Sequence, residues 1–120
     1  LVGTDASATG YTVHREMGVF VEAGLTAFQA LNAATAEAAR YLRKEGEFGT
    51  LVPGASADMV LLGANPLVDV ANTRLIRGVM IRGEWWSKQM IDAEIAAIQR
   101  EYAEDAARLR QLGILTPAER

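Results

Sequence analysis

The chain has 120 residues, half of them hydrophobic, and a formal net charge of −3 at pH 7. This length suits one small domain or part of a larger one. The slightly acidic balance gives no electrostatic footprint for nucleic acid. The absence of cysteine excludes a disulfide framework and a thiolate metal site, and is compatible with a reducing compartment.

No apolar run reaches the roughly 18 residues that span a bilayer. The chain shows no charged and apolar regions of a secretory leader, although its first residue is not methionine and its true N-terminus is not visible. We therefore expect a cytoplasmic protein without nucleic-acid or membrane partners.

Leu1–Asp5 is a short apolar stretch that ends in Gly-Thr-Asp. An isolated aspartate in this setting is more often the cap of a turn or helix. The pattern also suits the end of a buried parallel strand, where barrel enzymes place metal ligands and general bases. Because a loop and a helix follow, the order fits a β/α unit and makes Asp5 a candidate catalytic carboxylate.

Helical spacing of apolar residues predicts a helix over residues 13–24, with Gly24 ending it in the left-handed conformation. Thr26 and Gln29 form a predicted capping box at the start of a second, alanine-rich helix. That helix should continue as far as the polar segment 44–49. Its expected buried face consists of Ala27, Leu31, Ala34, Ala38 and Leu42.

The pattern changes to β character after the second helix. Residues 49–52 lead into a Pro-Gly turn, and residues 58–62 form a short apolar strand. Apolar runs on either side of residues 82–84 predict a β-hairpin. Two or three short strands cannot stand alone, so they need partner strands or a covering helix.

Residues 87–112 are predicted to form an amphipathic helix. Its apolar residues alternate in steps of four and three, and Asp105 interrupts one position. The stripe can pair with another helix, including that of a second copy in a homo-oligomer, or dock on the rest of a larger protein. Both uses are open. The stripe consists of Ile91, Ile95, Ile98, Tyr102, Leu109 and Leu112.

Six short runs follow one another in a fixed order along the first 86 residues. This series resembles the C-terminal part of the metal-dependent amidohydrolases, most closely the imidazolonepropionase-like and prolidase-like members. The runs are GYTVHREM at 10–17, VEAGLT at 21–26, ALNAAT at 30–35, GTLVPG at 49–54, ADMVLL at 57–62 and NPLVDV at 65–70.

The resemblance implies an α/β fold in which a TIM-type (β/α)₈ barrel is joined to a small β-sandwich built from both chain ends. Residues 1–46 would be the last barrel strand, its loop and helices. Residues 47–86 would be the C-terminal part of the composite sandwich. Residues 87–120, a C-terminal amphipathic helix and tail, extend past the pattern.

The resemblance also implies the chemistry. Family members hold one or two divalent metals, usually zinc, with histidines from earlier strands, and the strand-eight aspartate ligates a metal and shuttles a proton. That role falls on Asp5. The implied reaction is hydrolysis of a C–N bond in a small amide, cyclic amide or dipeptide by metal-activated water. The family's other metal ligands lie on strands outside these 120 residues, so we expect the chain alone to be inactive.

His14 is the only histidine, and one histidine cannot make a zinc site, which needs three or four protein ligands. In the family a histidine often lies here, near the pocket mouth, in a run like His14–Met17. Its role is either structural packing or substrate contact. Ser7 and Thr9, in the loop after Asp5, are further candidates for substrate contact.

Two other interpretations belong beside the catalytic one. In the family the Ala-Asp pair, here Ala57-Asp58, orients the sandwich and is not catalytic. A different function altogether is a non-catalytic, self-associating interaction module that uses the 87–112 helix.

Overall fold

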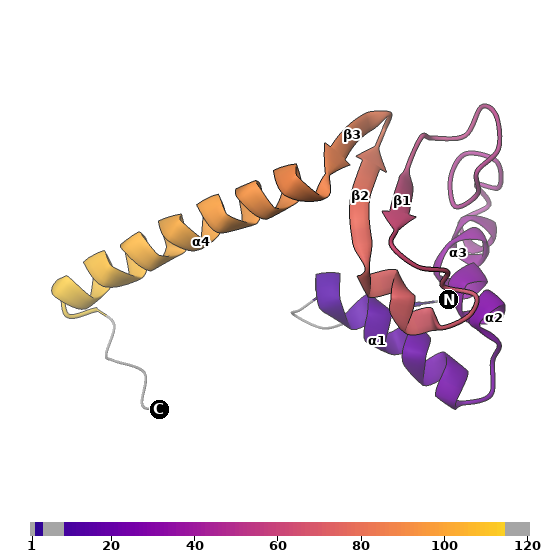
Figure 1. Ribbon diagram of the computed structural model, residues 1–120, viewed down its shortest axis with the longest axis horizontal. Helices are drawn as coiled ribbons and strands as arrows, with labels where there is room; N and C mark the ends of the chain where they lie inside the picture. Colours follow the sequence, from indigo (N-terminus) through magenta and orange to yellow (C-terminus); the bar gives the residue numbers. More distant parts are fainter. Residues whose placement is uncertain (1, 4–8, 115–120) are drawn as a thin grey trace. The chain divides into compact units, whose positions relative to one another are not determined.

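The computed structural model of the chain describes residues 2, 3 and 9–114. These belong to two compact units, residues 1–87 and residues 88–120. The described part of the first unit contains the helices α1, α2 and α3, a three-stranded sheet and a short 3-10 helix, η1. That of the second is the single helix α4 (Figure 1).

Helix α1 spans Thr9–Glu22 and so begins four residues before the predicted start. The prediction followed apolar spacing, which the first turn lacks. The predicted end is confirmed: Gly24 has φ +103°, and the amide of Leu25 donates to the carbonyl of Phe20 at 3.0 Å. A residue with a side chain would be strained at this φ, so glycine favours the turn into the next helix.

Helix α2 spans Ala27–Ala34 and begins with the predicted capping box. The Thr26 amide donates to Gln29 Oε1 at 2.8 Å, and the Gln29 amide donates to Thr26 Oγ1 at 3.2 Å. Two amides that the helix start would leave unpaired are thereby satisfied.

The prediction of one long second helix is wrong. The backbone breaks at Thr35 (φ −128°, ψ −92°), and a separate short helix, α3, spans Ala36–Tyr41. Thr35 Oγ1 donates to the carbonyl of Leu31 at 2.8 Å, an example of a threonine hydroxyl competing for a helical carbonyl. The expected buried face is also wrong in part, since Leu42 is 57% exposed. The buried alanines are Ala30, Ala33 and Ala39.

The predicted β character of residues 49–52 is not realised, because this segment is irregular. Gly49 has φ +80° and lies against the break between α2 and α3. A Cβ atom at Gly49 would lie 2.8 Å from the Thr35 carbonyl oxygen, so no larger residue fits without movement. The loop after α3 is therefore packed closely on that junction.

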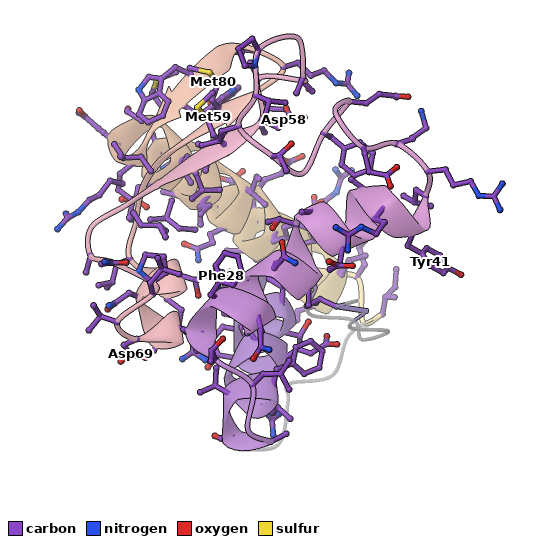
Figure 2. All side chains as sticks on the ribbon, turned by 90° about the vertical axis from the view of Figure 1, so that its right-hand side faces the viewer. Phe28, Tyr41, Asp58, Met59, Asp69 and Met80 are labelled. Carbon is purple, nitrogen blue, oxygen red and sulfur yellow. The ribbon has the colours of Figure 1, made fainter. Side chains whose placement is uncertain are left out.

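The sheet consists of β1 (Met59–Leu62), β2 (Ile76–Ile81) and β3 (Glu84–Ser87), antiparallel in the order β1-β2-β3. The predicted strand at 58–62 and the predicted hairpin are confirmed. The hairpin turns at Arg82 and Gly83, both at positive φ (51° and 85°), as a tight primed turn requires. Met59 pairs with Met80, and Figure 2 shows the two side chains beside each other.

The 3-10 helix η1 spans Val70–Arg74, between β1 and β2, and was not predicted. Asp69 caps its start, with Oδ1 accepting from the Ala71 amide at 2.8 Å. Val70 is buried with Met17 of α1 and Ala30 of α2. The core of the first unit therefore lies where α1, α2 and η1 meet.

Helix α4 spans Lys88–Gln111 and confirms the predicted C-terminal helix. None of its residues is buried, and Lys88 forms an ion pair with Asp92 one turn later. Within the described ranges, no helix combines the length and the apolar character needed to cross a bilayer.

Gly78 of β2 permits the ring of Trp85, on the neighbouring strand, to lie across it. A Cβ atom at Gly78 would be 2.2 Å from ring carbons of Trp85 and 3.0 Å from the Trp86 carbonyl oxygen. Even alanine would therefore displace the ring or the strand.

We expect Gly78→Ala to lower the free energy of unfolding by about 1–3 kcal/mol, because overpacking forces the ring out of place. The free energy of unfolding is measured by urea denaturation, followed by tryptophan fluorescence. Gly18→Ala, inside α1 with nothing within 4 Å of the added Cβ, is the matched control. It should be neutral or stabilise by up to about 1 kcal/mol. Equal stability of Gly78→Ala and wild type would contradict the packing described.

Candidate functional site

The residues that lead to the predicted catalytic carboxylate are held between two helices. The Val2 amide donates to the Ala33 carbonyl of α2 at 3.3 Å, and the Gly3 amide donates to Glu16 Oε1 of α1 at 3.0 Å. Asp5 and Ser7 themselves lie outside the described residues. Thr9 is the first residue of α1, and its side chain is likewise outside the described part of the chain.

His14 joins α1 to η1. Its Nδ1 lies 3.0 Å from the hydroxyl oxygen of Thr73, which is 59 residues away in the chain. The Thr73 hydroxyl also donates to the carbonyl of Val70 at 2.8 Å. Thr73 is only 6% exposed, and it is the one buried polar residue in the described part of the chain. The structure thus brings His14 to a partner that the sequence patterns did not indicate.

A second contact between the same elements is cationic. The guanidinium of Arg74 lies over the ring of Tyr11, 5.1 Å from the ring centre, within the usual range of a cation–π contact. Thr73 and Arg74 were missed because residues 71–76 show no helical or strand periodicity. The preceding NPLVDV run contributed to the family resemblance, but it did not predict a helix or strand at Thr73 and Arg74.

An open cavity of about 460 Å³ lies between α1 and η1, in the same unit. Its charged lining is balanced, with two arginines and two carboxylates around the imidazole. The remaining lining is small and apolar, including Gly18, Val19 and Val70. The charged and titratable lining residues are His14, Arg15, Glu22, Asp69 and Arg74.

The environment of His14 favours its neutral form. Partial burial lowers the pKa of the imidazole below its ordinary value of 6.5, and the nearby positive charge of Arg74 lowers the pKa further. A neutral imidazole keeps one nitrogen that can accept a hydrogen bond or a proton. At neutral pH, His14 can therefore accept a hydrogen bond from a polar group of a ligand.

Two further aspartates, Asp58 and Asp69, have structural partners. Asp58 Oδ1 accepts from the Arg82 amide and Oδ2 from the Ser56 hydroxyl, each at 2.6 Å. The Ser56 hydroxyl first, and then the Arg82 amide, lower the pKa of Asp58. Asp58 thus braces the β2–β3 turn, whereas Asp69 caps η1, well away from it (Figure 2). This bracing agrees with the orienting role that the resemblance implied for Ala57-Asp58.

The described residues do not fit a metal ion by themselves. Over residues 2, 3 and 9–114, no three or more histidine, cysteine, aspartate or glutamate side chains come together as a metal site would require. The positive charge of Arg74 also acts on His14 and disfavours a bound cation there.

Comparison with known proteins identifies the class of this chain. A model of the amidohydrolase family matches residues 1–86. Because the match covers more than half of the chain, the chain belongs to the amidohydrolase family, and the predicted family is confirmed. The closer likeness to imidazolonepropionase-like and prolidase-like members stays a prediction.

The structure is also similar to the crystal structure of an amidohydrolase. The two share 29% sequence identity with a TM-score of 0.55, over 62% of this chain and 19% of that protein. The chain therefore spans about a fifth of the length of this relative. None of the curated proteins matches the chain. The mixed α/β structure with its small antiparallel sheet agrees with this likeness.

The lowered pKa of His14 predicts a pH-dependent stability. Below about pH 6.5 the unfolded chain binds a proton at this site more readily than the folded chain does. The stabilisation is complete above that pH and is lost as the pH falls through the lower pKa of the folded state. Urea unfolding at about pH 7.5, 6.5, 5.5 and 5.0, chosen to bracket this range, should show a steeper loss of stability for wild type than for His14→Gln. Parallel pH profiles for the two proteins would contradict the prediction.

Proposed function

We propose that this chain is the C-terminal part of a metal-dependent amidohydrolase that hydrolyses a C–N bond in a small amide, cyclic amide or dipeptide. The observation that supports this most is the family match over residues 1–86, which includes Asp5. Family membership indicates hydrolase chemistry, while the substrate is set by loops that differ among members of one fold.

The proposed architecture is the last strand of a TIM-type barrel with its helices, followed by part of a β-sandwich. Two observations support it. Residues 2 and 3 are hydrogen-bonded to α2 and α1, so the segment just before Asp5 lies beside the helices that follow it in the chain, as in a β/α unit. Large apolar side chains are exposed in the first unit, including Val68 (82%), Leu51 (75%) and Phe28 (64%). Such surfaces usually contact further protein.

In the proposed reaction, the Asp5 carboxylate accepts a proton from the attacking water and returns it to the leaving nitrogen. A divalent metal would lower the pKa of that water and polarise the carbonyl. The resemblance implies that this metal is zinc. Residues 2, 3 and 9–114 hold no cluster of metal-ligating side chains, and the resemblance implies that the ligands other than Asp5 come from earlier barrel strands. His14 and Ser7 are the proposed substrate contacts from this part of the protein.

The alternative of a self-associating module gains no support from the comparisons, because the family match covers residues 1–86 and not α4. The exposed stripe of α4 agrees equally with docking on the rest of the protein.

The decisive experiment uses the full-length protein encoded by the reading frame that contains this chain. An N-acyl amino acid, a dipeptide and a cyclic amide serve as probes, with and without a chelator. We expect turnover that the chelator abolishes and that Asp5→Asn lowers by about 10²–10⁴-fold, the usual contribution of a proton-transferring group.

Asp92→Asn is the matched control, since Asp92 lies on the exposed helix α4 and forms an ion pair with Lys88 of the same helix. It should retain wild-type turnover. The 120-residue chain alone should show none. Metal-dependent hydrolysis by the isolated chain, or full activity of Asp5→Asn, would contradict the proposed function.

A further inference from the structure

The hydroxyl group of Thr73 lies between two potential acceptors. Its oxygen is 2.8 Å from the Val70 carbonyl oxygen and 3.0 Å from Nδ1 of His14. A hydroxyl has one proton to donate and two lone pairs with which to accept. A carbonyl oxygen can only accept. The single proton of Thr73 therefore decides which of the two imidazole tautomers is present.

The geometry favours donation to Val70. A threonine hydroxyl that donates back to a carbonyl one turn earlier is a common local arrangement. If the proton instead pointed to Nδ1, the hydroxyl and carbonyl oxygens would face each other at 2.8 Å with lone pairs only. Thr73 is 6% exposed, so water offers little relief from that repulsion. The hydroxyl then accepts from His14, which must carry its proton on Nδ1.

This assignment leaves Nε2 of His14 as a hydrogen-bond acceptor. A free neutral imidazole side chain prefers the opposite tautomer, with the proton on Nε2, so the protein imposes the less common form. Nδ1 is the ring nitrogen that contacts Thr73, so Nε2 is the nitrogen left to meet a ligand. The imidazole lines the cavity between α1 and η1, and the nearby Arg74 opposes its protonation.

We propose that Thr73 is a positioning residue that fixes His14 in the Nδ1–H tautomer, so that Nε2 accepts a hydrogen bond from the N–H group of an amide substrate. The proposal rests on the proposed function for its ligand, and it adds the direction of the hydrogen bond. With the proton on Nε2, the same histidine would instead bind carbonyl or carboxylate oxygens. The tautomer therefore selects the chemical group that the imidazole recognises.

The first test is the tautomer itself. The full-length protein, labelled with ¹⁵N-histidine, is examined near pH 8, where the imidazole is neutral. The His14 signals are assigned by their absence from His14→Gln. We expect Nδ1 to be the protonated nitrogen and Nε2 the unprotonated one. A wild-type spectrum with the proton on Nε2 would overturn the proposal without any further variant.

The second test concerns Thr73. Thr73→Val keeps the shape of the side chain and removes the hydroxyl, and Thr73→Ser keeps the hydroxyl. We expect Thr73→Val to shift the tautomer to Nε2–H, and Thr73→Ser to retain Nδ1–H. If Thr73→Val retained Nδ1–H, Thr73 would not be the determinant. If Thr73→Val did not fold, the wild-type and Thr73→Ser spectra would still show which nitrogen of His14 carries the proton.

The kinetic readout uses whichever of the three amide probes is hydrolysed fastest. We expect Thr73→Val to raise KM roughly 3- to 10-fold, as for the loss of one hydrogen bond, with kcat within about twofold. Thr73→Ser should restore KM. A fall in kcat with unchanged KM would contradict a contact to bound substrate.

The two proposals fail in different ways. The tautomer is measured without turnover, so an Nδ1–H imidazole in a protein that hydrolyses no amide would leave the tautomer assignment standing and refute the amide ligand. Conversely, an Nε2–H imidazole in an amidohydrolase that requires Asp5 would refute the role of Thr73 alone.

Discussion

The packing of α1 against η1 is the constraint on which the first unit depends. It joins the helix that follows Asp5 to a segment between two strands of the sheet, more than fifty residues later. Met17, Ala30 and Val70 form the buried centre of this contact. Burial of a methionine or valine side chain stabilises by about 1.5–3 kcal/mol. One net hydrogen bond contributes about 0.5–1.5 kcal/mol, so apolar burial supplies more of the energy than the His14–Thr73 bond does.

The hydrogen bond instead specifies how the two elements meet. A rotation of α1 that preserved apolar contact would break the hydrogen bond between the His14 imidazole and the Thr73 hydroxyl, although the hydroxyl would keep its bond to the Val70 carbonyl. The loss would cost about 0.5–1.5 kcal/mol, the net contribution of one hydrogen bond. The bond therefore favours one setting of α1 relative to η1.

The elements that could be predicted from the sequence are those set by neighbouring residues. Gly24 and the Thr26–Gln29 capping box fix the turn between two helices, and Arg82-Gly83 fixes a hairpin. The break at Thr35 and the formation of η1 were not predictable in this way. Both depend on contacts distant in sequence, such as Gly49 packed on the Thr35 carbonyl and Val70 packed on Met17.

The same distinction applies to the candidate site. Local pattern and family resemblance indicated His14 as a candidate, but not its partner, because no periodicity links a helical histidine to a threonine 59 residues away. Asp5 and Ser7 lie outside the described residues, so their proposed roles still rest on the resemblance and the family match.

Helix α1 positions two parts of the proposed site at once. Glu16 holds the Gly3 amide, two residues before Asp5, and His14 contacts η1 and lines the cavity. Positions two apart on an α-helix are separated by about 200° around its axis. One side of α1 therefore holds the Gly3 amide while another holds the imidazole, and a shift of α1 would displace both. In an active site, errors of about 1 Å in the position of such groups can cost about 10²-fold in rate. If the proposed function holds, the buried contact of Met17 with Val70 serves the position of the imidazole as well as the stability of the first unit.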